Sequence, residues 1–158
     1  MNNNPGGVKG VRGWLFLLCL TLTVLDPLAI VSSLFAGASS LKPDFDRHPA
    51  LLRLILISGV FKLALAVFSV YSGITLWRML PGAVSTASKY LKAMFAYSVL
   101  AIFLPGLVGL PQELYREMAG PDFVSSVLTL AYSAAWLLYL KRSKRVKATY
   151  QGPKATFD

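Results

Sequence analysis

Asp26 and Lys62 are the only ionisable residues that lie deep inside long apolar stretches of this chain. Either charge alone in hydrocarbon costs about 2.5 kcal/mol or more on insertion scales, so each needs a polar partner. Asp26 lies about ten residues before Ala36 and Lys62 about eleven after Leu51, which at ~1.5 Å per residue predicts similar depths of about 15 Å on adjacent antiparallel helices. The sequence therefore predicts an intramembrane ion pair.

Small and polar residues recur at helical spacing around both charges, and such residues let helices approach closely and form hydrogen bonds with each other. They are Cys19, Thr23, Asp26, Ser33 and Gly37 on the first stretch, and Ser58, Lys62, Ala66, Ser69 and Gly73 on the second. We expect these two stripes to face each other. The charged pair has three interpretations: a structural link between helices, a substrate or proton pathway, or two charges that do not meet.

Pro27 directly follows Asp26 in the first stretch. Because proline has no amide hydrogen, the carbonyl four residues earlier, that of Thr23, loses its helical donor. This predicts a kink in the first helix beside Asp26.

Four long apolar stretches, residues 14–36, 54–77, 93–110 and 123–140, position these residues. Each is near the ~20 residues with which a helix crosses ~30 Å of hydrocarbon. Of the 158 residues 55% are hydrophobic, and a soluble core of this size could not bury so many apolar side chains. We expect an all-α fold, an integral membrane four-helix bundle with antiparallel neighbours, in which residues 1–158 form a single transmembrane domain.

Basic residues gather in alternate loops of this predicted bundle. The amino terminus, the second loop and the tail together contain eleven basic residues and one acid, Asp158. The basic residues are Lys9, Arg12, Arg78, Lys89, Lys92, Lys141, Arg142, Lys144, Arg145, Lys147 and Lys154. Positive charges near span ends stay in the cytoplasm, so we expect both termini to be cytoplasmic.

The third loop is expected to contain a short helix that lies in the outer interface. From Gln112 to Met118 the apolar Leu114 and Met118 fall on one side at helical spacing, while charged residues point elsewhere. Gly120-Pro121 is expected to end this helix before the fourth span.

The basic tail, residues 141–158, begins with five basic residues within seven positions, which are Lys141, Arg142, Lys144, Arg145 and Lys147. Near an anionic leaflet each contributes about 1 kcal/mol, so we expect the tail to contact anionic lipid headgroups. Nothing else on the cytoplasmic side offers a surface for nucleic acid, so no nucleic-acid partner is expected. Amphipathic rings near the cytoplasmic span ends favour the headgroup region. They belong to Trp14, Trp77, Tyr90, Trp136 and Tyr139.

Trp136 and Tyr139 close the last stretch, and the tail continues as Ser143-Lys144-Arg145-Val146-Lys147-Ala148-Thr149-Tyr150. This pattern, together with the opening Gly13-Trp14-Leu15, resembles the signature of the bacterial domain-of-unknown-function family 2569. The resemblance implies a small four-helix inner-membrane protein with no established activity, and it supplies no catalytic residues. Asp26 and Lys62 are not part of the matching motif. The tail motif has two interpretations, a docking peptide for a partner or a topology signal that contacts lipid.

The residues for several kinds of chemistry are missing. With one histidine, His48, and one cysteine, Cys19, the chain can form neither an intrachain disulfide nor a bis-histidine haem site, and a Cys/His nucleophile pair is not available. His48 lies near Asp44 and Asp46, but their spacing matches no known metal site. We therefore expect no enzymatic activity, no metal and no cofactor.

The leading hypothesis is a structural or accessory multi-pass protein of the bacterial inner membrane that associates with itself or with a larger membrane complex. The alternative is a small transporter or channel, in which Asp26 titrates or binds a cation and Lys62 is its internal counter-charge.

Overall fold

The computed structural model describes residues 13–41, 49–109 and 112–150, and within these ranges the chain forms helices and turns without any strand. The elements are α1 (Trp14–Leu20), the π-helix η2 (Thr21–Leu25), α2 (Asp26–Leu41), α3 (Pro49–Trp77), α4 (Ala83–Leu107), α5 (Gln112–Arg142) and α6 (Lys144–Tyr150). Among these described residues, four segments are long and apolar enough to cross a membrane. They are Trp14–Gly37, Ala50–Trp77, Ala83–Leu107 and Phe123–Arg142. The predicted all-α fold with four spans is confirmed.

The third span differs from the prediction in where it begins. Helix α4 starts at Ala83 instead of Ala93, so Lys89 and Lys92 lie on an exposed helical surface and not in a loop. Hydropathy detects the apolar part of a helix, whereas helix formation also continues through lysine, alanine and serine. The loop between α3 and α4 is correspondingly short.

Helix α5 also differs from its prediction. It begins at Gln112 and continues through Gly120 and Pro121 to Arg142, so residues 112–118 form its first turns and not a separate helix. A proline removes one helical hydrogen bond, but near a membrane surface water or polar groups can bond to the freed carbonyl. The backbone therefore continues through the expected break.

The chain reverses between α3 and α4 at Pro81-Gly82, a dipeptide that is typical of turns. Gly82 precedes the first residue of α4 with a φ of 84°, a left-handed conformation that glycine adopts without steric cost. This turn leads α4 back along α3.

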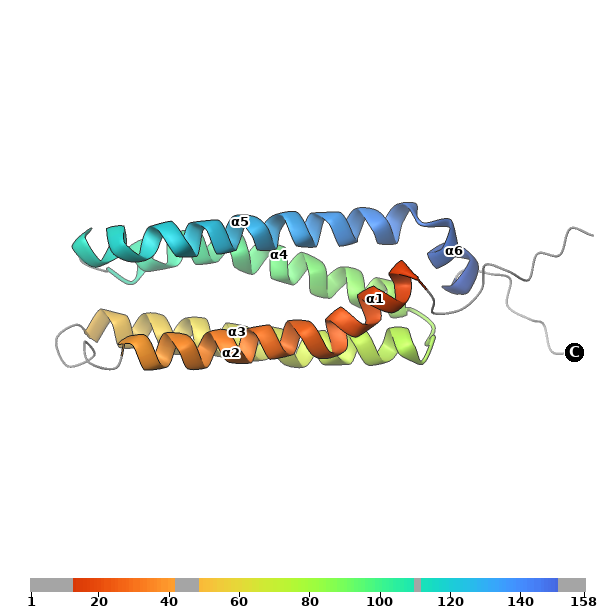
Figure 1. Ribbon diagram of the computed structural model, residues 1–158, viewed down its shortest axis with the longest axis horizontal. Coiled ribbons are helices and arrows are strands. Elements are labelled where there is room, and N and C mark those ends of the chain that lie inside the picture. Colours follow the sequence, from red (N-terminus) through yellow and green to blue (C-terminus); the bar gives the residue numbers. More distant parts are fainter. Residues whose placement is uncertain (1–12, 42–48, 110–111, 151–158) are drawn as a thin grey trace, which may run out of the picture.

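Consecutive helices pack side by side in chain order, with α2 on α3, α3 on α4 and α4 on α5 (Figure 1). Helix α5 packs mainly along α4 and reaches the first span through the side chain of Asp26. Figure 1 also shows α1 leaning away from the line of α2 towards α6. The π-helix η2 lies at this bend, and such turns are a known cause of helix kinks.

The hydrophobic core lies mostly in one half of the bundle. We call this the α6 half; it contains α1, the end of α3, the start of α4, the end of α5 and α6. Its fully buried side chains include Leu15, Leu18, Leu22, Leu76, Tyr90, Leu91 and Val146. In the opposite half, every described side chain of α2 after Asp26 is half-buried or exposed. The first span thus buries one side in protein before Asp26, whereas after Asp26 no described side chain of α2 is fully buried.

Candidate functional site

The backbone directly before Asp26 forms a π turn, in which the amide of Asp26 donates to the carbonyl of Thr21, five residues earlier. In this register the next donor would meet the carbonyl of Leu22, but the next residue is Pro27, which has no amide hydrogen. The hydroxyl of Ser69 in α3 donates to the Leu22 carbonyl at 2.7 Å instead. A side chain from the second span therefore replaces the hydrogen bond that the proline removes.

The first two spans touch closely one turn away from this bond. A Cβ on Gly73 would overlap the Thr23 hydroxyl and lie 2.9 Å from the Thr23 nitrogen, so only glycine allows the two backbones to approach this closely. The Thr23 hydroxyl donates to the carbonyl of Cys19 at 2.6 Å and accepts the indole N–H of Trp77 at 3.0 Å. These contacts confirm that the predicted stripes of small and polar residues face each other here.

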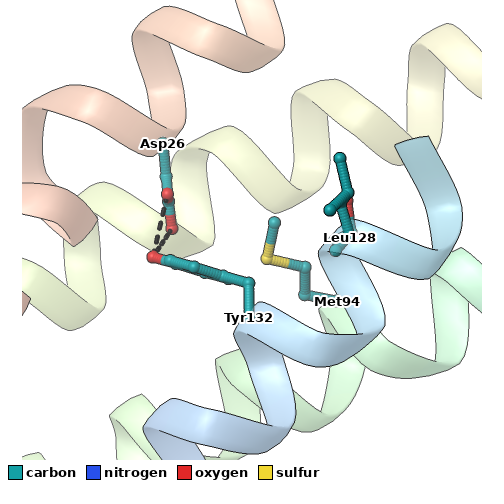
Figure 2. Close-up of a pocket in the computed structure, with 5 residues that line it drawn as sticks. Asp26, Met94, Leu128 and Tyr132 are labelled. Atoms are coloured by element: carbon teal, nitrogen blue, oxygen red, sulfur yellow. Dashed lines mark hydrogen bonds between the residues drawn. The ribbon is translucent and has the colours of Figure 1, made fainter. Parts of the chain in front are cut away.

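The carboxylate of Asp26 points across the bundle and accepts hydrogen bonds from two tyrosines. Tyr90 of α4 donates to Oδ2 at 3.0 Å, and Tyr132 of α5 lies 3.0 Å from Oδ1 and 3.2 Å from Oδ2. Figure 2 shows the Tyr132 hydroxyl beneath the carboxylate. Asp26 is only 8% exposed, so these bonds replace most of the water that the carboxylate would have in solution. The site links three of the four spans.

The predicted ion pair is not present, because the structure does not bring Asp26 and Lys62 together. The ammonium of Lys62 lies 3.4 Å from the hydroxyl of Ser33, two turns further along the first span, and the carboxylate has the tyrosines as partners. The predicted register assumed that the first helix ends near Ala36, whereas α2 continues to Leu41. Helix α3 also begins at Pro49, two residues before Leu51, so the observed helix ends account for only part of the shift of seven residues that places Ser33 beside Lys62.

A pocket of about 210 Å³ opens beside the carboxylate. It is lined by Asp26 from the first span, Met94 from α4, and Leu128, Thr129 and Tyr132 from α5 (Figure 2). Leu128 is 65% exposed, so the pocket reaches the surface of the bundle about five residues inside the start of the fourth span. The site therefore places a buried acid beside an open, shallow depression on the surface of the bundle.

The tail motif folds back onto the bundle as α6. Ser143 precedes this helix, and its hydroxyl lies 3.4 Å from the amide of Val146 in a capping position. Val146 is fully buried, and the hydroxyl of Tyr150 donates to the carbonyl of Leu76 at 2.7 Å. The aromatic part of the motif is thus used within the protein and covers the end of α3.

The basic residues of the tail point elsewhere. Lys141, Arg142, Lys144 and Lys147 are exposed, whereas the side chain of Arg145 falls outside the described residues. Trp136 packs edge to face on Tyr139 and on Tyr132, with ring centroids 5.6 and 6.3 Å apart, and Thr149 is half-buried. The motif residues and the basic residues therefore form two separate surfaces.

The sequence prediction missed both tyrosines of the site. Tyr90 was expected to favour the headgroup region, but it is fully buried and packs its ring on Phe68. Tyr132 lies ten residues before Arg142, deeper than the aromatic belt of a membrane protein. A hydroxyl at that depth needs a bonding partner, and this was the signal that could have paired Tyr132 with Asp26.

Within the described ranges, no group of three His, Cys, Asp or Glu side chains could hold a metal ion. His48, Asp44 and Asp46 lie outside those ranges. Cys19 is buried in the core beside Leu18 and Leu22.

Comparison with known proteins finds one family. The family model described as "Protein of unknown function (DUF2569)" matches residues 8–151, which is nearly the whole chain. No curated protein and no solved structure matches the sequence.

Proposed function

The chain belongs to this family of proteins of unknown function, and from that premise we propose that it is a non-enzymatic accessory protein that associates with itself or with a larger membrane complex. We place it in the bacterial inner membrane with both termini in the cytoplasm. The four long apolar helices support a multi-pass membrane protein, and the alternating loop charges support the orientation. A reporter fused after Asp158 would test the orientation, because activity on the outer face would contradict it.

The observation that carries the association is the environment of Lys62. Its ammonium lies within the second span, and its hydrogen-bond partner is the neutral hydroxyl of Ser33. No described acidic residue forms an ion pair with it, since Asp26 is bonded to tyrosines. A lysine in this position is costly in hydrocarbon and normally finds an opposite charge. A carboxylate on a neighbouring helix of a second copy or of another protein would supply it.

The exposed surface around Lys62 suits such a neighbour. Val60, Phe61 and Leu63 are all exposed beside it on α3, which gives a partner helix apolar surface on both sides of the charge. The open half of α2, with Leu28 and Phe35 exposed, continues this surface on the first span.

The tail supports a second contact, with anionic headgroups. Because Val146 and Tyr150 hold α6 on the bundle, the exposed Lys144 and Lys147 stay near the end of the last span. At that position each basic residue contributes about 1 kcal/mol near an anionic leaflet. This favours lipid contact over use of the motif as a free docking peptide.

Association can be tested by mild detergent extraction followed by a measurement of particle mass by light scattering. We expect the native protein to run as an assembly, Lys62→Met to shift towards monomer by at least tenfold in dissociation constant, and Lys62→Arg to keep the assembly. Lys92→Met is the matched control, because Lys92 is an exposed lysine in the first half of α4. A native protein that is strictly monomeric and copurifies with nothing would refute the proposal.

The pocket beside Asp26 favours a second candidate, a small transporter or channel. A carboxylate within a span and next to an open pocket is the usual type of group on a proton or cation path. Lys62 is not the direct counter-charge in this version, because it contacts Ser33. If proton or ion flux into reconstituted vesicles is the same for native protein and Asp26→Asn, this candidate fails.

A further inference from the structure

Most hydrogen-bond donors of the pocket beside Asp26 are already used within the protein, whereas several acceptors are still available. The hydroxyl hydrogens of Tyr90 and Tyr132 are donated to the carboxylate. The Thr129 hydroxyl donates to the carbonyl of Ser125 at 2.9 Å. What remains towards the pocket is lone pairs, on the Thr129 and Tyr132 oxygens and on the carboxylate, which has about four acceptor positions. A polar ligand must therefore bring hydrogen-bond donors.

The charge in the pocket adds a second requirement. Both tyrosines are neutral donors, and no basic residue in the described part of the chain forms an ion pair with Asp26. Hydrogen bonds donated by both tyrosines stabilise the ionised carboxylate, which in that form has no counter-charge from the described part of the chain. Charged groups at low dielectric attract an opposite charge more strongly than they do in water. The complementary ligand group is thus a cation that carries N–H donors.

The walls of the pocket set the rest of the ligand. Leu128 and Met94 are apolar, and Leu128 lies at the open side, about five residues inside the start of the fourth span. A volume of about 210 Å³ corresponds to roughly seven water molecules at ~30 Å³ each. That is room for a small head group and the first carbons of a chain, and a longer chain would continue between lipids.

We propose that the pocket binds the ammonium group of a protonated primary amine that carries an apolar chain. The ammonium donates to Asp26 and to the Thr129 oxygen, and the chain leaves past Leu128 towards the bilayer. This names a ligand class for the site used by the second candidate function, and it rests on that function only in taking Asp26 as the cation-binding group. It requires neither flux nor association.

The test is equilibrium binding of tritiated octylamine to the full-length protein in a neutral maltoside detergent, with detergent alone as background. We expect saturable binding to the native protein that is weakened at least tenfold in Asp26→Asn. Octyltrimethylammonium, which has the charge but no N–H donor, should compete at least tenfold less well than unlabelled octylamine. Octanoate should not compete.

Asp26→Asn also removes a buried charge that holds two tyrosines, so a second variant is needed that leaves these bonds intact. Leu128→Trp fills the mouth of the pocket from an exposed position and should reduce binding at least tenfold. Val67→Trp is the matched control, because Val67 is 72% exposed on α3, and it should bind octylamine like the native protein.

Four results would overturn the inference: no saturable binding to the native protein, equal binding to Asp26→Asn, equal binding to Leu128→Trp, or equal competition by octyltrimethylammonium. The first would mean that only a proton or water occupies the site. Because binding is measured without vesicles, flux that depends on Asp26 in the absence of amine binding would leave the transporter candidate in place and remove only the ligand class. Amine binding without flux would keep the ligand class and remove the transporter candidate.

Discussion

The two halves of the bundle are built differently, although the same four spans pass through both. In the α6 half, leucines, Tyr90 and Val146 are fully buried, and α6 covers the end of α3. In the opposite half, α2 has no fully buried side chain among its described residues after Asp26. A membrane protein gains little from burying apolar groups away from lipid, so tight packing marks where geometry must be fixed.

Asp26 lies at the boundary between these halves, and this position explains its surroundings. The π turn, the Ser69 bond and the Gly73 contact all fix the backbone on the packed side of Asp26. The pocket opens on the other side, towards Leu128 and Thr129. The packed half thus holds the carboxylate in place, while the open half gives access to it.

The largest difference between the halves should appear when one leucine of the first span is shortened in each. Leu18 is fully buried in the α6 half, and Leu28 is 63% exposed in the other. Leu18→Ala leaves a cavity and should lower the free energy of unfolding by about 2–5 kcal/mol, whereas Leu28→Ala should change it by less than about 1 kcal/mol. Unfolding in mixed micelles, followed by helical circular dichroism, measures both. Equal losses would show that the halves are packed alike.

Two glycines of α3 give a sharper comparison, because the change is a single methyl group. On Gly73 it would meet the backbone of Thr23, whereas on Gly59 its nearest neighbour is the Leu34 side chain at 3.7 Å. Gly73→Ala should destabilise the protein by about 1–3 kcal/mol through overpacking, and Gly59→Ala should be neutral or slightly stabilising because alanine favours helix. The same unfolding measurement compares the stability of the two variants. A neutral Gly73→Ala would mean that the first two spans separate at no cost.

Hydropathy was sufficient to predict four helices long and apolar enough to span a membrane, because crossing hydrocarbon imposes both length and composition. It could not predict how the helices align. The register between the first two spans depends on where each helix ends, and α2 continues to Leu41 through residues that are no longer strongly apolar. Counting depth along each helix paired Asp26 with Lys62, whereas in the structure Lys62 lies beside Ser33, seven residues further along the first span.

The sequence predicted only one residue of the candidate site, because it does not show how the helices align. A charge inside an apolar stretch is visible in any sequence, so Asp26 was found. Its partners are neutral tyrosines on two other spans, and their use depends on tertiary contacts that periodicity does not encode. The tail gave the opposite result: its motif was recognised, but burial of Val146 and the bond from Tyr150 to Leu76 became evident only in three dimensions.

The smallest effect is expected at the α6 end, where one hydroxyl anchors the tail. Burial, with smaller effects from Cys19 and Tyr139, raises the pKa of Tyr150, so the hydroxyl keeps its proton and its bond to Leu76 at neutral pH. This stabilisation is complete below the usual tyrosine pKa of about 10 and declines above it, where the unfolded chain ionises first. Tyr150→Phe keeps the ring and should cost about 1 kcal/mol, the net value of one hydrogen bond. It should also increase amide hydrogen exchange in α6, while exchange around Leu28 stays unchanged. If exchange rises equally in both regions, α6 is not a separate cap, and the two halves unfold as one unit.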